Sequence, residues 1–434
     1  MIRRHGTRQA SLLFLGDLIS YTLALWLTLL LRYWTLPSWS IFLDHLYPFS
    51  IVWLIWVVIF FIADLYGRQS SAFDSRLAET VINAQLAGSF LTIVFFYYVS
   101  FFSITPKLTL FLDLILSLGL VFIWRRYGSR SLRRGRIEKY LFHCQGSEVD
   151  ELKQELERSP RYQVKVVDYD GPLARLDAKE VSTLVLNFYD RRTVSELSAC
   201  YRLMVAGVAV ISAHRLYEEV FGRIPLTVIS EQWFLEHVEH EAGLTYQLVK
   251  RLMDFVIGLV LAIISLPFYP IIALAIFLND RGPIFYREDR VGRAGRIFRI
   301  TKFSSMNNSE PDLALRQVTL VGRILRKTRL DELPQLWSVI VGQQSLIGPR
   351  PERPEYVEVY SRQIPYYQAR HLITPGLSGW AQIYQTHHPH FRLALDATRE
   401  KLSYDLYYIK NRSLWLDITI TLKTIKTLLS QVGI

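Results

Sequence analysis

Cysteine is scarce in this sequence. Only Cys144 and Cys200 occur among 434 residues, and they lack the close spacing of a metal-binding pair. Both fall in a segment that we place in the cytosol, where thiols stay reduced. A small-residue cleavage site is also missing after the first apolar run, so the sequence predicts no cleavable signal peptide. We therefore expect neither a cysteine metal site nor a cleaved leader.

Acidic residues are outnumbered. The chain has 50 Lys and Arg against 39 Asp and Glu, a net charge of +11. A basic protein favours phosphate-bearing partners, whether nucleic acid, anionic lipid or phosphorylated substrate. The aromatic residues lie inside apolar runs and are not interleaved with lysines, an arrangement that suits nucleic acid poorly. We therefore expect a membrane and a phosphorylated substrate, and no nucleic-acid partner.

Long apolar runs fill the first part of the chain. Half of all residues are hydrophobic and the mean hydropathy is positive, which points to membrane insertion. Four stretches each have about the 17–25 residues that a membrane-spanning helix needs. They lie at residues 10–31, 46–64, 81–102 and 108–124. The sequence predicts a four-helix transmembrane bundle over residues 1–130.

The flanking charges set the orientation of this bundle. Arginines precede the first stretch, separate the second from the third and follow the fourth, whereas the opposite loops carry little more than Arg32 and Lys107. The positive-inside rule then places both ends of the bundle in the cytoplasm. Asp17 and Asp113 lie within apolar runs, where a buried acid marks either an ion path or packing between helices; we favour packing.

Residues 137–240 have a different pattern. Short apolar runs at residues 140–144, 164–169, 181–188 and 208–212 alternate with helix-like stretches at residues 148–158 and 193–205. This alternation predicts a small Rossmann-like, CoA-binding-like α/β domain in the cytosol. The turn after the first predicted strand has one glycine, Gly146, where nucleotide-binding turns have several. We favour a structural or regulatory domain over a nucleotide-binding one.

A further apolar stretch, residues 252–278, contains Pro267 near its middle. Proline removes a backbone hydrogen bond and kinks a helix. Basic residues stand at both ends of the stretch, so we predict a re-entrant helix over residues 250–279 that enters one leaflet and returns to the same face. A kinked full span is the alternative. A third domain is predicted over residues 245–434, with an interfacial amphipathic helix at 413–434.

Asp331 and Glu332 follow four cations within nine residues. Phosphoryl transfer needs a nucleophile, a bridging divalent cation and positive charge for the transition state. One carboxylate can attack phosphorus while its neighbour shares Mg²⁺, which binds one or two carboxylates together with substrate phosphates. The alternative is a surface helix with a solvated charge cluster.

Three further motifs contain cationic side chains or a tight backbone turn. In Gly348-Pro349-Arg350-Pro351 the prolines would hold Arg350 in a fixed geometry, where its planar guanidinium can grip a phosphate. Pro375-Gly376, followed by Gly379, marks a tight turn. The glycine- and arginine-rich residues 282–303 suit lipid head groups, polyprenyl phosphate or a nucleotide, or a plain lipid-facing patch.

Together, these motifs resemble the large monotopic phosphoglycosyl transferases of the bacterial sugar transferase family, which initiate exopolysaccharide, capsule and O-antigen synthesis. The resemblance is dense over about residues 250–430. It is carried by Lys250-Arg251, Asp254, Pro267, Gly282-Pro283, Lys302-Phe303, residues 328–335, Gly348-Pro349-Arg350-Pro351 and Pro375-Gly376. The family usually has serine directly before the proline, where this chain has Leu266 and places Ser265 one residue earlier. It often has glutamine where Glu288 stands.

The resemblance implies a fold: a four-helix transmembrane bundle, the small α/β domain, and an α-rich monotopic catalytic domain on a re-entrant helix broken at Pro267. It also implies residue roles. Asp331 would be the nucleophile, Glu332 would help to hold Mg²⁺ or steer the attacking phosphate, and Arg350 would bind phosphate. Substrate binding or site structure would fall to Lys302, Arg329, Arg370, His371 and Gln382.

The reaction implied by the resemblance has two steps. Asp331 attacks the sugar-bearing phosphorus of a UDP-sugar and releases UMP, and polyprenyl (undecaprenyl) phosphate then takes up the phospho-sugar. The resemblance also implies membrane lipids and a homodimer as partners and the bacterial inner membrane as location, with catalysis on the cytoplasmic face. The sequence does not identify the sugar, although glucose or galactose would follow family habit.

Two readings compete with an enzyme. A non-catalytic membrane scaffold or regulator of polysaccharide assembly should have lost Asp331, Glu332 and Arg350 first, and all three are present. A transporter or receptor built on the four apolar stretches leaves the C-terminal motifs unexplained. His387, His388 and His390 in a polar loop suggest a metal site less than a surface loop.

Overall fold

The fold was analysed in a computed structural model. It describes residues 2–63, 65–66, 77–98, 107–128, 137–159, 162–169, 171–238, 243–307, 317–385 and 394–430. The three histidines at 387, 388 and 390 lie outside these ranges. The chain divides into two compact units, and the division passes through the small α/β region: the first unit holds residues 1–141, 153–168 and 179–183, and the second holds the rest.

The first unit is built on four apolar helices. They are α1 (Ile2–Tyr33), α2 (Trp39–Ile62), α3 (Leu77–Tyr98) and α4 (Lys107–Ile123), and a π-helical turn, η1 (Trp124–Gly128), follows the last. Packing of α1 against α4 and of α2 against α3 buries a core that includes Tyr21, Phe49 and Trp56. Residues Ser11–Tyr33 and Trp39–Ile62 are long and apolar enough to cross a membrane, whereas the apolar part described in α3, Thr80–Ile93, is shorter.

Asp17 is an interhelical packing residue in this unit. Arg125 donates to both of its carboxylate oxygens, at 3.2 Å through Nε and 2.5 Å through Nη2, and Tyr66 donates a third bond at 2.8 Å. These bonds join α1 to η1 and to the turn after α2. Asp113 is also fully buried, but within the described part of the chain neither of its carboxylate oxygens has a hydrogen-bond partner.

The small sheet expected in the middle of the chain is present. Its strands are β1 (Glu138–His143), β2 (Val164–Val167), β3 (Thr183–Leu186) and β4 (Ala209–Ser212). The strand order is β2-β1-β3-β4, and β1 pairs with β2 in parallel. The intervening helices are α6 (Ser147–Arg158), η2 (Leu173–Arg175), α7 (Arg191–Ser195), α8 (Leu197–Val205) and α9 (Ala213–Phe221).

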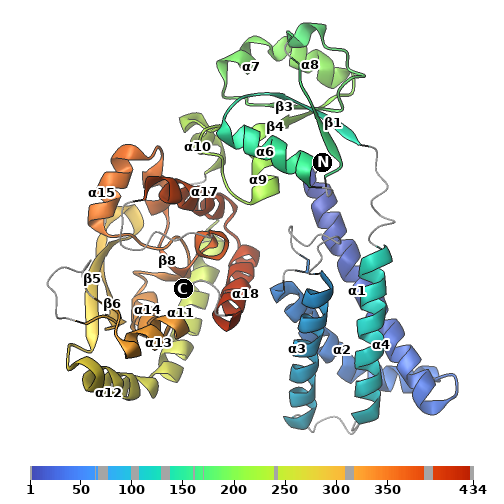
Figure 1. The fold of residues 1–434 in the computed structure, drawn as a ribbon, viewed down its shortest axis with the longest axis vertical. Coiled ribbons are helices and arrows are strands. Elements are labelled where there is room, and N and C mark those ends of the chain that lie inside the picture. The colour runs from blue at the N-terminus through green and yellow to red at the C-terminus, as the bar shows by residue number, and fades with distance from the viewer. Residues whose placement is uncertain are drawn as a thin grey trace. The chain divides into compact units, whose positions relative to one another are not determined.

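A broken apolar helix opens the C-terminal part of the second unit. After α10 (Glu231–His237), α11 (Leu244–Ser265) and α12 (Phe268–Asp280) meet at a bend of 56°, visible at the lower left of Figure 1. The break lies at Pro267, which has no N–H to bond to the preceding turn. The hydroxyl of Ser265 donates to the carbonyl of Ala262 at 2.7 Å. The bend fits a broken span or a re-entrant helix equally.

Short elements complete the unit. The antiparallel hairpin β5 (Phe285–Val291) and β6 (Ile297–Phe303) pairs Tyr286 with Lys302. The others are η3 (Arg293–Gly295), α13 (Leu320–Thr328), η4 (Leu330–Gln335), α14 (Leu336–Val341), β7 (Ser345–Ile347), α15 (Pro354–Gln363), η5 (Tyr367–Leu372), β8 (Gly376–Ser378), α16 (Trp380–Tyr384), α17 (Leu395–Asn411) and α18 (Leu414–Ser430). The apolar core beneath η4 joins Ile272 and Ile276 of α12 to Phe303 and Leu325.

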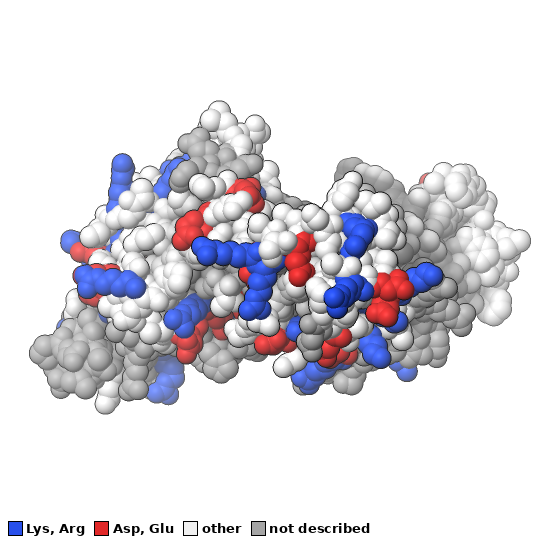
Figure 2. Space-filling view, turned by 90° about the horizontal axis from the view of Figure 1, so that it is seen from above, with Lys and Arg blue, Asp and Glu red and all other residues white. Residues whose placement is uncertain are grey.

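Charged side chains of both signs are interspersed on the face drawn in Figure 2. Among the exposed side chains of the described residues, Arg362 pairs with Glu358 at 2.6 Å and Arg399 pairs with Asp396 at 3.3 Å. Such exposed pairs contribute little to stability. The net positive charge does not gather on that face into one continuous basic patch.

Candidate active site

Asp331 and Glu332 are placed by a sharp change of helix type. The helix α13 ends at Thr328, and Arg329 takes the left-handed conformation, with φ +58°. The 3₁₀ helix η4 then begins, and its Leu330 and Leu333 pack into the apolar core with α12. The two carboxylates between these leucines lie beside β6, which packs against η4. Asp331 is 8% exposed.

Glu332 is surrounded by cations. Arg350 donates to its Oε1 at 2.8 Å, and Nζ of Lys302 and Nη1 of Arg329 lie 3.6 Å and 3.8 Å from the same oxygen. Burial alone would raise the pKa of this carboxyl, but the three cations outweigh burial and lower the pKa to about 2. Glu332 is therefore a fixed negative charge at any physiological pH.

Asp331 has the opposite electrostatic environment. Its Oδ1 is buried and has no hydrogen-bond partner among the described residues. Burial and the charge of Glu332 raise the pKa of Asp331 to about 6, against the opposing effect of Lys302, Arg326 and Arg329. Neighbouring carboxyls whose pKa values are pushed apart are typical of groups with separate roles in one reaction.

Lys302 connects this pair to a second buried acid, Glu288. Nζ of Lys302 lies 3.8 Å from Glu288 Oε1, and Glu288 also pairs with Arg290 at 2.5 Å and with Arg353 at 2.9 Å. Burial lowers the pKa of Lys302, while Glu332 and Glu288 oppose the effect of burial. The site thus holds more cations than acids, as the binding of a diphosphate requires.

Residues 349–352, here called the Arg350 loop, are fixed at four successive backbone carbonyls. Two of them accept from backbone amides: the Pro349 carbonyl from Gly376 and the Glu352 carbonyl from Val291, both at 2.9 Å. The other two accept from side chains: the Arg350 carbonyl from Arg370 and the Pro351 carbonyl from Arg290, also at 2.9 Å. Four donors from β5, η5 and β8 therefore hold this loop. Such clamping pre-organises the Arg350 side chain, because little freedom remains to be lost when it binds a charged group.

Gly376 owes its identity to close backbone packing. It pairs with Ser345 across the parallel strands β7 and β8. A Cβ added to Gly376 would lie 2.1 Å from the Gly348 nitrogen, so no other residue fits without moving the Arg350 loop. The turn predicted at Pro375-Gly376 is thus a support of the loop.

The other predicted substrate-binding residues lie behind or beside this cluster. Arg370 is buried, with Nη2 donating to Asp405 and Nη1 to the Tyr367 hydroxyl, both at 2.8 Å. His371 is buried, and burial together with the charge of Arg370 lowers its pKa to about 4. Gln382 donates to the Leu377 carbonyl at 3.2 Å. Lys302, Arg329 and Arg350 therefore gather around Glu332, whereas these three residues are held by other parts of the site.

The pair fits a divalent cation of the magnesium type. Among the described residues Asp331 Oδ1 has no hydrogen-bond partner, and Glu332 is the next residue in the chain. Magnesium takes one or two carboxylates and fills its remaining positions with phosphate oxygens and water. Within the described ranges no group of three or more His, Cys, Asp and Glu side chains is placed to hold a metal, so the fit is to an ion shared with a phosphorylated substrate.

The region that contains this site is similar to known proteins. The profile of the family described as bacterial sugar transferase matches residues 245–431. A UDP-glucose:undecaprenyl-phosphate glucose-1-phosphate transferase of Caulobacter vibrioides is 40% identical over 188 residues, which cover 42% of this chain and 70% of that protein. The chain belongs to the bacterial sugar transferase family.

Other members of the bacterial sugar transferase family are similar over part of their length. A UDP-N-acetylgalactosamine-undecaprenyl-phosphate N-acetylgalactosaminephosphotransferase of Aeromonas hydrophila is 39% identical over 243 residues, 54% of this chain and 55% of that protein. A UDP-glucose:undecaprenyl-phosphate glucose-1-phosphate transferase of Escherichia coli is 37% identical over 190 residues, 41% of this chain and 40% of that protein. The matched segments thus span about half the length of these two relatives.

Several residues of this site received no role of their own from the sequence, although Arg290 lies within the arginine-rich residues 282–303 described above. Arg290 follows Glu288 by two positions on β5, and alternation along a strand was a signal that both face one side. Lys401 and Asp405, one helical turn apart on α17, pair with Glu352 and Arg370. Their spacing marks one helix face, but nothing in it identifies partners 49 and 35 residues away.

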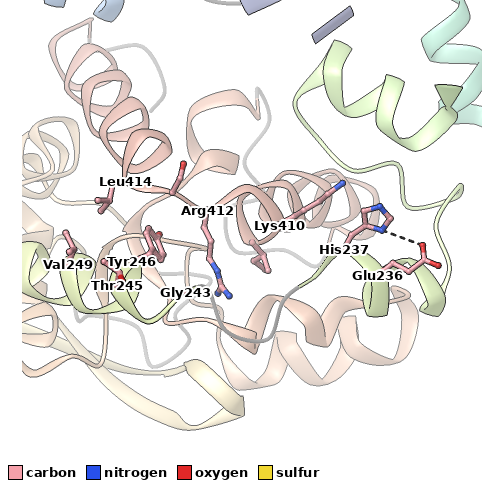
Figure 3. Close-up of a pocket in the computed structure, with 11 residues that line it drawn as sticks. Glu236, His237, Gly243, Thr245, Tyr246, Val249, Lys410, Arg412 and Leu414 are labelled. Carbon is pink, nitrogen blue, oxygen red and sulfur yellow. Dashed lines mark ion pairs between the residues drawn. The ribbon is translucent and has the colours of Figure 1, made fainter. Parts of the chain in front are cut away.

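A cavity of about 560 Å³ lies elsewhere in the second unit (Figure 3). It is lined by the end of α10, the start of α11 and the junction of α17 with α18, including His237, Tyr246 and Arg412. Lys410 lines it too, but this side chain is paired with Glu218 at 2.5 Å. Lys302, Arg329 and Arg350 do not line this cavity, so it is separate from the cations around Glu332.

Proposed function

We propose that this protein transfers a sugar-1-phosphate from a UDP-sugar to polyprenyl phosphate, giving a polyprenyl diphosphate sugar and UMP. The observation that supports this best is the pair Asp331 and Glu332, two adjacent carboxyls whose pKa values are pushed to about 6 and about 2 inside a cluster of cations. The substrate class comes from the relatives, whose names contain both a UDP-sugar and undecaprenyl phosphate.

In the first step Asp331 is the nucleophile. A carboxylate oxygen attacks the sugar-bearing phosphorus of the UDP-sugar, the bond from that phosphorus to the bridging oxygen breaks, and UMP leaves with the electron pair. The product is a phospho-sugar aspartate. A pKa of about 6 leaves Asp331 mostly ionised at neutral pH and more basic than an exposed aspartate, which favours attack.

In the second step an oxygen of polyprenyl phosphate attacks the same phosphorus. The acyl phosphate bond breaks, Asp331 regains its carboxylate and the polyprenyl diphosphate sugar is released. Arg350, Lys302 and Arg329 neutralise the phosphate charge in both steps from fixed positions. Asp331 and Glu332 would hold Mg²⁺, which when bound supplies further positive charge to the phosphate oxygens.

The membrane arrangement is part of the proposal. We place α11 and α12 as a re-entrant pair, because α12 packs directly beneath η4 and its other side exposes Ile271, Leu274 and Leu278. A helix with this apolar surface in the leaflet would bring Asp331 to the membrane face, where polyprenyl phosphate presents its head group. On this arrangement the four N-terminal helices cross the inner membrane and catalysis takes place on the cytoplasmic face; we also propose a homodimer.

The test is an activity assay with the purified full-length protein. It would be incubated with Mg²⁺, undecaprenyl phosphate and a panel of UDP-sugars that includes UDP-glucose, UDP-galactose and UDP-N-acetylgalactosamine, and UMP release would be followed beside an Asp331→Asn variant. UMP from the wild type alone would establish the reaction and name the sugar. A folded wild type that releases no UMP from any sugar would favour a non-catalytic membrane scaffold.

A further inference from the structure

The helix α17 supports the Arg350 loop from behind. Lys401 forms an ion pair with Glu352, and Asp405 accepts from Arg370 at 2.8 Å. Lys401, Asp405 and Arg370 are all buried. Because Arg370 donates to the Arg350 carbonyl and Glu352 belongs to the same loop, the position of α17 determines how firmly the loop is held.

The helix α17 also contacts residues 222–227, here called the connecting segment. The amide of Ile224 donates to the Ser403 carbonyl at 3.0 Å, and the Ser403 hydroxyl returns a bond to the Ile224 carbonyl at 2.5 Å. The indole of Trp380 donates to the Gly222 carbonyl at 2.7 Å. The connecting segment is therefore docked on α16 and α17 through its backbone.

Arg223, in this segment, links two acids from distant parts of the chain. Its Nη1 lies 3.4 Å from Glu400 of α17 and its Nη2 lies 2.5 Å from Glu151 of α6. The guanidinium also lies 5.7 Å from the ring centroid of Tyr404 and 5.5 Å from that of Tyr217. Only a planar, forked cation can pair with two carboxylates and stack on aromatic rings at once.

A second contact attaches the connecting segment to α6. Glu148, in the first turn of α6, accepts from the amides of Leu226 at 2.9 Å and Thr227 at 2.8 Å. A Cβ on Gly146 would lie 3.5 Å from the Thr227 hydroxyl oxygen. The turn after β1 is where nucleotide phosphates bind in related sheets, and here the chain's own connecting segment lies against it. Gly146 itself has φ +141°, a backbone conformation that other residues rarely adopt.

We propose that Arg223 is a positioning residue of the catalytic site, which joins α6 to α17 and thereby keeps Lys401 and Asp405 in place to hold the Arg350 loop. Its consequence for catalysis rests on the proposed transferase function. Without Arg223, the acids Glu151 and Glu400 lose their shared cation, the rings of Tyr217 and Tyr404 lose the guanidinium between them, and α17 gains freedom to shift. The loop carbonyls then lose their fixed donors.

Amide hydrogen exchange tests this inference without relying on activity. Full-length protein carrying Arg223→Met would be compared with wild type, with exchange followed in peptides that cover Val291 and Gly376, whose amides donate to carbonyls of the Arg350 loop. We expect exchange at both to quicken by about tenfold or more, as local opening becomes easier. Arg399→Met is the matched control, because Arg399 is exposed on α17 and its ion pair among the described residues is with nearby Asp396; it should leave both peptides unchanged.

Exchange that quickens only in α6, the connecting segment and α17 would overturn the inference, since Arg223 would then merely attach two parts of the chain. If Arg223→Met fails to fold, the double variant Glu151→Gln with Glu400→Gln removes both ion pairs and keeps the guanidinium on its rings, and the same comparison applies.

The kinetic arm measures UMP release. Arg223→Met should lower kcat by about tenfold, and combining it with Asp405→Asn should cost little more than the worse single change, because both act through one clamp. Losses that multiply would contradict the proposed route. A wild type that releases no UMP would count against the proposed function, and the exchange result would still decide the role of Arg223.

Discussion

Nη2 of Arg350 lies 2.8 Å from Oε1 of Glu332. Through this bond a partly buried acid keeps its negative charge beside a second acid, Asp331, whose Oδ1 has no hydrogen-bond partner among the described residues. In the proposed mechanism, Arg350 neutralises Glu332 and leaves Asp331 available as the nucleophile. The clamp on four carbonyls of the Arg350 loop shows how much of the surrounding structure serves to hold this one cation.

Arg350→Lys should lower kcat/KM for UMP release by about tenfold, and Arg350→Met by about 100-fold or more, because loss of one fixed charge contact in a transition state costs about 3 kcal/mol or more. A lysine retains the charge but cannot form the forked contact. Steady-state kinetics would measure both. Arg362→Met, at an exposed arginine on α15, is the control, and equal rates for all three proteins would remove Arg350 from the chemistry.

Pro267→Ala tests the bend between α11 and α12. Alanine restores a backbone donor and favours a continuous helix, so the pair should straighten toward a full span and carry Arg281 to the opposite membrane face. Accessibility of a cysteine introduced at Arg281, probed from each side of sealed vesicles, would measure the change. If the cysteine at position 281 were labelled from the outer side in the protein that keeps Pro267, α11 and α12 would instead be a kinked full span.

His214 should make the fold sensitive to acid. Burial, aided by the charges of Lys410, His237 and Arg215, lowers its pKa to about 3, below the ordinary value of about 6.5. A lowered pKa gives stability that is present above pH 6.5 and is lost as the pH falls toward 3, by up to about 1.4 kcal/mol per pH unit. His214→Asn should flatten this loss, as thermal unfolding between pH 7 and 4.5 would show.

The same experiment has an internal comparison. His371 also has a lowered pKa and should keep part of the acid sensitivity in the His214→Asn protein. An identical pH dependence for wild type and variant would mean that His214 binds a proton in the folded state without cost.

Asp113→Asn distinguishes packing from an ion path within the N-terminal helices. A carboxylate buried without a hydrogen-bond partner is costly in an apolar environment, so the amide should stabilise the protein by about 1–3 kcal/mol and leave UMP release unchanged. Thermal unfolding and the activity assay would measure both. A variant that keeps its stability but loses activity would favour a functional role for this acid.

The sequence carried more information about the catalytic cluster than about its support. Asp331, Glu332, Lys302 and Arg350 stand out because each lies in a short motif whose chemistry is local. The roles of Lys401 and Asp405 were invisible, since charges one turn apart on a helix normally face solvent and only the tertiary fold brings Glu352 and Arg370 to them.

The sequence left two roles open for Asp17, packing and an ion path, because its partner Arg125 is far away in the chain. Arg125 was interpreted as one of several arginines at the cytoplasmic end of the fourth apolar stretch, and its bonds to Asp17 span 108 positions. Nothing in the periodicity of either helix links the two. The elements, by contrast, were well marked: apolar length predicted the N-terminal helices, and Pro267 predicted the break before α12.

The most direct test of the central claim is capture of the intermediate on Asp331. Purified protein would be mixed with Mg²⁺ and a radiolabelled UDP-sugar that is a substrate, without polyprenyl phosphate, and UMP and protein-bound label would be counted. We predict a burst of UMP close to one per active site, with the labelled phospho-sugar on the peptide that contains Asp331 and neither burst nor label in Asp331→Asn. UMP that forms only after the lipid is added, with no label on the protein, would contradict the covalent mechanism.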